Sequence, residues 1–156
     1  MRSRSSRGAG PRLRLTLQNP ARSRSLPPAA RFRRWARAAL ERDADITLRV
    51  VGEREGRRLN RDFRGSDHAT NVLTFPYRES APLAGDIVLC APVVRREARS
   101  RGIRAEAHYA HLTVHGTLHL QGHDHRRRRE AQAMEALESR ILLRLGYADP
   151  YGGEGQ

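Results

Sequence analysis

The period of the apolar residues changes repeatedly along this chain, and these changes constrain its fold more than any other feature. Between Leu13 and Leu17 leucines alternate with polar residues, which is the pattern of a half-buried strand. After Pro27 and Pro28 the apolar residues recur at intervals of three and four, which indicates an amphipathic helix as far as Leu40. The chain therefore begins with a strand followed by a helix.

The rest of the chain continues this succession of strands and helices. Short apolar runs predict further strands at residues 46–51, 70–77 and 85–90. Segments with helical periodicity, several of them bounded by Pro or Gly, predict helices at residues 53–63, 92–100, 105–121 and 126–145. The order β-α-β-α-β-β-α-α-α predicts an α+β fold, with a four-stranded mixed sheet packed with about five helices.

Length and composition predict one domain. The chain has 156 residues, 38% of them hydrophobic, which suffices for one modest core over residues 11–148. Residues 1–10 are predicted to form a disordered basic tail, and residues 149–156 a flexible C-terminal tail.

The apolar runs are too short for a membrane helix, and no secretory segment is found near the start. Cys90 is the single cysteine of the chain, and we expect it to be buried. A lone thiol is typical of a reducing compartment, so we predict a soluble cytoplasmic protein without a membrane partner.

A formal net charge of +13 predicts a polyanionic partner, because dense arginine attracts phosphate backbones. All 30 basic residues are Arg, which is as typical of a genome-wide composition bias as of a phosphate site. The charge balance therefore supports a nucleic-acid partner, whereas the choice of Arg over Lys does not.

Histidines form the densest functional pattern, since six of the seven lie between His108 and His125. His115 and His119 are four residues apart on a predicted helix, so their imidazoles share one face and can bind one metal ion. Gly122 then ends the helix, because a residue without Cβ adopts the left-handed conformation cheaply, and His125 can return as a third ligand. The spacing predicts one Zn²⁺ per chain, with the fourth position open for water.

Neighbouring residues leave alternatives open at this site. His111 continues the same helical face and His123 lies near the third ligand, so either is a candidate substitute ligand or a second-layer partner. Asp124 is a candidate to orient a ligand or act as a base, or is simply a turn residue. The position where zinc peptidases carry a Glu general base holds Gly116, which disfavours a metallopeptidase.

Three blocks of sequence resemble a known family. Residues 115–125 (His-Gly-Thr-Leu-His-Leu-Gln-Gly-His-Asp-His) are similar to the signature of the YbeY endoribonucleases, bacterial rRNA maturation factors, with His123 where Tyr is usual. Residues 59–76 resemble the family's block Leu-Asn-x-x-(Tyr/Phe)-Arg-Gly-x-Asp, which ends in Phe-Pro, and residues 85–87 resemble its Gly-Asp-Ile strand. The resemblance extends over residues 13–145.

This resemblance implies a metal-dependent enzyme that cuts single-stranded RNA, acts in 16S rRNA 3′-end maturation and ribosome quality control, and associates with the small ribosomal subunit. It implies His115, His119 and His125 as zinc ligands and Arg64 as the catalytic or RNA-positioning arginine. The attacking group is left open between metal-activated water and the 2′-OH of the RNA, and so is the oligomeric state. The alternative of a different class is an rRNA-binding assembly factor whose metal is structural.

A run of four arginines directly follows the predicted site. These residues either contact the RNA backbone or form the solvated start of the last helix. Positive charge is unfavourable at the N-terminus of a helix, which favours a phosphate partner. The candidate RNA contacts are Arg126, Arg127, Arg128 and Arg129.

Overall fold

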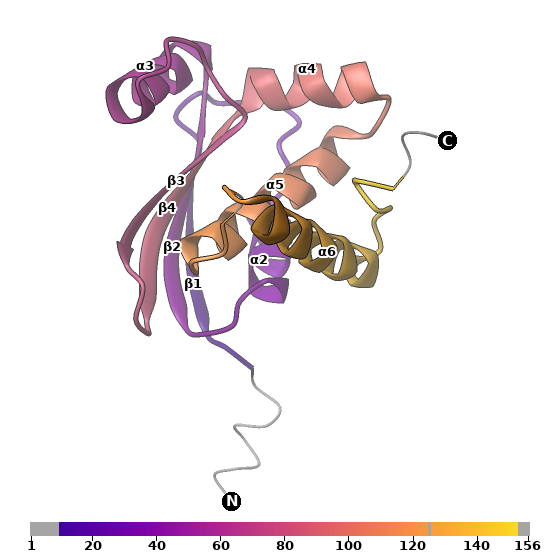
Figure 1. Ribbon diagram of the computed structural model, residues 1–156. Helices are drawn as coiled ribbons and strands as arrows, with labels where there is room; N and C mark the ends of the chain where they lie inside the picture. The colour runs from indigo at the N-terminus through magenta and orange to yellow at the C-terminus, as the bar shows by residue number, and fades with distance from the viewer. Residues whose placement is uncertain (1–9, 125, 153–156) are drawn as a thin grey trace, which may run out of the picture.

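The computed structural model describes residues 10–124 and 126–152 (Figure 1). The order of strands and helices is the predicted one, and the α+β class is confirmed. Boundaries differ from the predicted ones by one or two residues at most elements, as is usual where helices fray and strands end. The elements are β1 Leu13–Gln18, α2 Ala29–Ala38, β2 Ala44–Val51, α3 Glu53–Arg64, β3 Val72–Arg78, β4 Leu83–Cys90, α4 Ala91–Arg101, α5 Ala105–Leu120 and α6 Arg128–Leu145.

The four strands form one mixed sheet in the order β1-β2-β4-β3. β1, β2 and β4 are parallel, and β3 is antiparallel to β4. This follows from the connections, since β3 and β4 are joined by a short turn, whereas α2 connects β1 to β2. The predicted mixed sheet is confirmed.

Successive residues of β4 point to opposite faces of the sheet and so divide the apolar residues into two clusters. Ile87 and Leu89 belong to the main core, which α2, α5 and α6 cover on one side of the sheet (Figure 1). Val88 and Cys90 belong to a smaller cluster together with Leu59 of α3. Cys90 is buried as predicted, and burial raises the pKa of its thiol.

The helix that carries the histidines, α5, is held at the centre of the main core. It contacts α2, α4, α6, β3 and β4. Phe32 and Trp35 of α2 and Tyr109 of α5 are buried, and their rings pack edge to face, with centroids 5.2 Å apart for Phe32–Trp35 and 5.7 Å for Phe32–Tyr109. Each such pair contributes about 0.5–1.5 kcal/mol beyond the buried area. This aromatic packing holds α5 against α2.

Two glycines allow α5 to lie close to β4. A Cβ on Gly85 would lie 2.7 Å from Leu120 Cδ2, and a Cβ on Gly116 would lie 3.1 Å from Ile87 Cγ2. A Cβ at Gly85 would require the side chain of Leu120 to shift, and it would also crowd the carbonyl of Phe75 at 3.1 Å. Close packing here places the end of α5 beside β3.

Side-chain hydrogen bonds are found at the start of α6 and in the segment after it. α6 begins at Arg128, two residues later than predicted, and the backbone N–H of Arg127 donates to Glu130 Oε1 at 3.4 Å. In the part of the predicted C-terminal tail that the structure describes, Asp149 Oδ1 accepts a hydrogen bond from Ser139 Oγ at 2.6 Å. Residues 1–9 and 153–156 of the predicted tails lie outside the described residues. Among the described helices, none combines the length and apolarity needed to cross a bilayer.

Candidate metal centre

His115 and His119 lie one helical turn apart on α5, as their spacing predicts. Their ring centroids are 6.2 Å apart, and the ring planes are inclined by only 27°. Both side chains are half-buried. The third predicted ligand, His125, lies outside the described residues, and within those residues no group of three His, Cys, Asp or Glu side chains is placed to hold a metal ion.

The turn after α5 reverses the chain immediately after His119. Gly122 has φ of +99°, a conformation that favours glycine. Its N–H donates to the carbonyl of His119 at 3.1 Å, and the N–H of His123 donates to that of Leu118 at 3.2 Å. These two bonds form the Schellman motif that commonly ends helices. The predicted role of Gly122 in ending the helix is confirmed.

Each of the two imidazoles is held through Nδ1 by a polar side chain of a neighbouring element. His115 Nδ1 lies 2.6 Å from Glu138 Oε2 of α6, and His119 Nδ1 lies 3.1 Å from Thr74 Oγ1 of β3. A carboxylate only accepts hydrogen bonds, so Nδ1 of His115 carries the proton and Nε2 is the nitrogen that would bind a metal. The Thr74 hydroxyl can hold His119 in the same tautomer. This arrangement fits a zinc ion bound through two Nε2 atoms.

Glu138 is the buried acid at this site, with 0% of its surface exposed. Burial opposes its negative charge, but hydrogen bonds from His111, His115 and Tyr151 outweigh burial and hold the pKa of Glu138 at about 2. The predicted second-layer residue His111 is linked to His115 through Glu138, with Nε2 at 2.9 Å from Oε1, and its ring also lies edge to face with that of His115, with centroids 6.5 Å apart. An ionised carboxylate that accepts from an imidazole stabilises the ligand orientation that a cation requires.

Glu138 and Thr74 are not among the predicted site residues. Thr74 lies in the block of residues 59–76 that resembles the family, but as an ordinary strand residue it is not singled out within that block. Glu138, however, lies on a face of α6 whose other buried members are apolar, namely Met134, Ile141 and Leu142. An acid at an apolar position of an amphipathic helix is a sequence signal for a buried polar network.

A pocket brings Arg64 together with the two histidines. Arg64 is the last residue of α3, and its side chain is exposed. The other lining residues belong to β3 and to the loop before it. The full lining is Arg64, Thr70, Asn71, Val72, Thr74, His115 and His119.

The loop between α3 and β3 forms one wall of this pocket and is held by side chains of α3. The buried Asn60 donates through Nδ2 to the carbonyl of His68 at 2.7 Å. Arg57 donates to both carboxylate oxygens of Asp67, at 2.8 and 2.9 Å. The block of sequence around Asn60 and Asp67 thus builds the wall on which Arg64 is placed.

The remaining predicted residues lie around the turn after α5. His123 Nε2 is 2.8 Å from Glu41 Oε2. Asp124 forms an ion pair with Arg126, with 3.0 Å between Oδ2 and Nε. The predicted basic run is exposed to solvent at the start of α6, and its members are Arg126, Arg127, Arg128 and Arg129.

Comparison with known proteins gives the family. The model of the endoribonuclease YbeY family matches residues 20–146. Proteins named Endoribonuclease YbeY are 56% identical over 144 residues in Methylobacillus flagellatus, which covers 92% of this chain and 97% of that protein, and 60% identical over 149 residues in Aromatoleum aromaticum, which covers 92% and 95%.

The fold is shared with a solved structure, the solution structure of TM1509 from Thermotoga maritima, with a TM-score of 0.55. The two sequences are 24% identical, and the match covers 89% of this chain and 98% of the other. Together with the family match, these relatives confirm the resemblance seen in the sequence. The chain belongs to the endoribonuclease YbeY family.

Proposed function

We propose that this protein is a zinc-dependent endoribonuclease that hydrolyses phosphodiesters of single-stranded RNA. The observation that carries the proposal is the pocket that Arg64 shares with His115 and His119. The name of the relatives, Endoribonuclease YbeY, supports the activity, and a net charge of +13 supports a polyanionic substrate. We further propose that the substrate is rRNA at the 16S 3′ end, that the protein acts at the small ribosomal subunit in the cytoplasm, and that it contributes to ribosome quality control.

The zinc ion would be held by His115, His119 and His125. When bound, such an ion supplies a Lewis acid for a phosphoryl oxygen and lowers the pKa of a coordinated water toward about 7. The contribution of the protein is to hold the two imidazoles of α5 in one orientation, which Glu138 and Thr74 support through the two Nδ1 atoms.

Arg64 would bind the phosphate that is being cut. Attack on a phosphodiester places negative charge on its non-bridging oxygens, and a guanidinium donates two parallel hydrogen bonds to such oxygens. Arg64 is suited to this role because it is exposed and lines the pocket beside both imidazoles.

The two alternative functions have less support. A structural metal is disfavoured because α5 is already held by buried side chains such as Leu112, Val114 and Leu118. A peptidase is disfavoured because the position of its general base is Gly116, where a Cβ would lie 3.1 Å from Ile87.

The test is metal content by mass spectrometry together with cleavage of a single-stranded RNA, for the wild type, His119→Ala and His68→Ala. His68 is exposed and does not line the pocket, so His68→Ala is the matched control. We expect the wild type and the control to bind one zinc per chain and to cut RNA, and His119→Ala to lose both while remaining folded by circular dichroism.

The other outcomes separate the alternatives. Zinc without cleavage in the wild type would support the assembly factor, and unfolding of His119→Ala would support a structural metal. A wild type that binds no metal would contradict the zinc centre. Analysis of the products identifies the attacking group, because a 2′,3′-cyclic phosphate is formed only if the 2′-OH attacks.

A further inference from the structure

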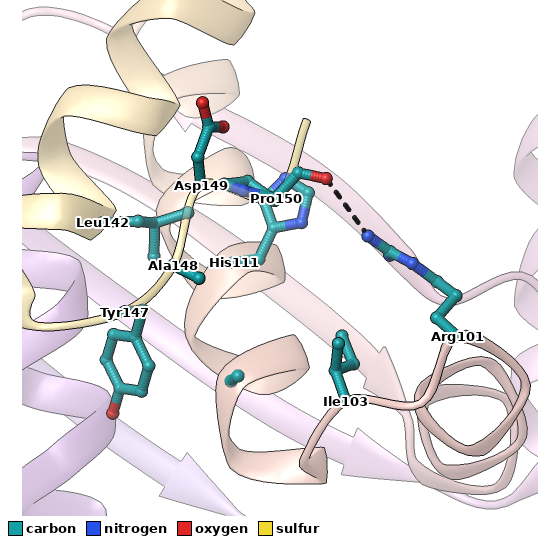
Figure 2. A pocket seen from close by; sticks show the side chains of 9 residues that line it. Arg101, Ile103, His111, Leu142, Tyr147, Ala148, Asp149 and Pro150 are labelled. Atoms are coloured by element: carbon teal, nitrogen blue, oxygen red, sulfur yellow. Dashed lines mark hydrogen bonds between the residues drawn. The ribbon is translucent and has the colours of Figure 1, made fainter. Parts of the chain in front are cut away.

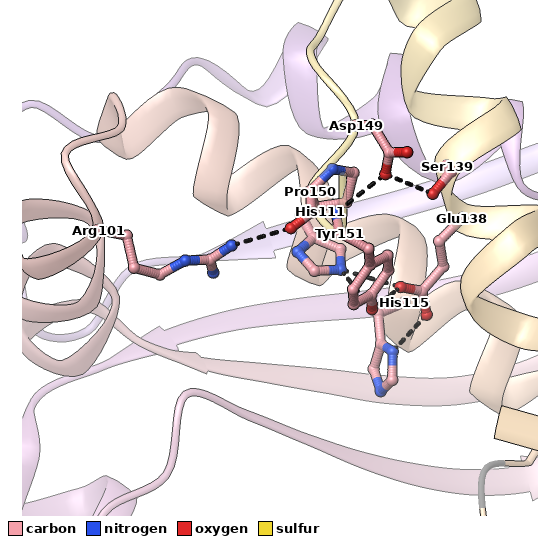
Figure 3. A network of polar contacts seen from close by, with 8 residues as sticks. All are labelled: Arg101, His111, His115, Glu138, Ser139, Asp149, Pro150 and Tyr151. Atoms are coloured by element: carbon pink, nitrogen blue, oxygen red, sulfur yellow. Dashed lines mark hydrogen bonds and ion pairs between the residues drawn. The ribbon is translucent and has the colours of Figure 1, made fainter. Parts of the chain in front are cut away.

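Three donors converge on the buried carboxylate of Glu138 (Figure 3). His115 Nδ1 lies 2.6 Å from Oε2, on the side of the pocket. The other oxygen, Oε1, accepts from His111 Nε2 at 2.9 Å and from the hydroxyl of Tyr151. A buried carboxylate is costly unless donors surround it, so this arrangement determines how the carboxylate is oriented.

The donor Tyr151 comes from the segment after α6, which is held on two sides. Asp149 accepts from Ser139 Oγ of α6 at 2.6 Å and from the backbone N–H of Tyr151 at 2.9 Å. Arg101, the last residue of α4, donates to the carbonyl of Pro150 at 3.4 Å across a pocket beside His111 (Figure 2). The segment is thus attached to both α4 and α6, and it places the Tyr151 hydroxyl against Glu138.

Resting on the proposed function, we propose that Glu138 is a positioning residue that determines the zinc affinity of the centre, and that Tyr151 is its anchor. Glu138 fixes the Nδ1–H tautomer of His115 and turns Nε2 toward the metal position. His111 and Tyr151 prevent rotation of the carboxylate by engaging its other oxygen. The C-terminal segment is therefore part of the support of the metal centre.

The principal test is Glu138→Gln, which keeps the size of the side chain and removes its charge. We expect a loss of zinc affinity of about 10–100-fold, measured by competition with a chromophoric chelator, because outer-layer partners of zinc ligands typically contribute this much. Glu135→Gln is the matched control, since Glu135 is exposed on the same helix, and its affinity is expected to equal that of the wild type. Glu138→Asp, which keeps the charge, is expected to recover part of the lost affinity.

Tyr151→Phe tests the anchor and serves as a second variant if Glu138→Gln does not fold. It removes one hydroxyl that donates to Glu138, and we expect an affinity lower by about fivefold, as for the loss of one hydrogen bond. Thermal unfolding of the metal-free proteins shows which variants are folded. Equal zinc affinity in the wild type and in each folded variant would overturn the inference while leaving the proposed function in place. Absence of zinc from the wild type would instead contradict the proposed function.

Discussion

At the scale of single residues, the position of Arg64 distinguishes it from the other arginines of α3. Arg57 forms an ion pair with Asp67, and Arg61 forms one with Asp62. These two guanidinium groups are therefore bound to carboxylates of α3 and of the loop that follows it. Arg64 is the residue at the end of the helix, where the chain turns into the pocket wall. Among the residues that the structure describes, no ion pair holds the Arg64 guanidinium, so it is exposed and available to a phosphate.

We expect Arg64→Ala to keep the zinc content and the unfolding temperature of the wild type and to lower the rate of RNA cleavage by about 10²–10³-fold, the effect of removing one donor to a developing oxyanion. The measurement is the single-turnover rate at saturating RNA. Arg58→Ala is the control, because Arg58 is exposed on the same helix and does not line the pocket. An unchanged rate in Arg64→Ala would exclude the proposed role.

The residue scale is also where sequence and structure differ most in what they reveal. The spacing of His115 and His119 predicts that their side chains share one face of a helix, because four residues make about one helical turn. Thr74 is 45 residues from His119 in the chain and still meets it at 3.1 Å. Such a pair is created by the packing of β3 beside α5, which no local spacing encodes.

At the scale of elements, the end of α5 determines where the chain continues after His119. Gly122 has φ of +99°, and a Cβ there would meet no atom of the described residues within 4 Å, so among these residues only the backbone conformation limits this position. Gly102 at the end of α4 is similar, with φ of +67° and no atom from the described part of the chain within 4 Å of a Cβ placed there, but it does not line the pocket of the two histidines.

We expect Gly122→Ala and Gly102→Ala each to lower the free energy of unfolding by about 1–2 kcal/mol, the cost of a left-handed conformation for a residue with a Cβ. Only Gly122→Ala is expected to weaken zinc binding as well, because it alters the turn that leads to His125. Urea unfolding and chelator competition measure the two effects. Equal zinc affinity in the two variants would show that this turn does not determine the ligand geometry.

At the scale of the whole molecule, the charge of +13 predicts that RNA binding weakens as salt is added. Arg128 and Arg129 are exposed at the start of α6, near the turn after the histidines. Arg33 and Arg34 are exposed on α2, in a groove with Leu145 at the opposite end of α6. The two pairs carry the same charge at different places on the molecule. Removing one pair or the other lowers the net charge equally, so any difference in RNA binding reports a local contact with RNA.

We expect the double substitution Arg128→Gln with Arg129→Gln to reduce the slope of log K against log salt by about 1.4, because each lost contact with single-stranded RNA accounts for about 0.7. The double substitution Arg33→Gln with Arg34→Gln is expected to leave the slope unchanged. Binding of a fluorescent single-stranded RNA at several salt concentrations gives both slopes. Equal slopes in the two variants would place the RNA away from the start of α6.

Local patterns were sufficient to predict the α+β class, the order of the elements and the pairing of His115 with His119, because each depends on periods of two or 3.6 residues along the chain. The turn at Gly122 is also predictable from local sequence, since it requires only a residue without Cβ. The strand order β1-β2-β4-β3, the pocket shared by Arg64 and the histidines, and the support of His115 by Glu138 and Tyr151 depend on the tertiary structure. These features join segments far apart in the chain, and burial in one core brings such segments together.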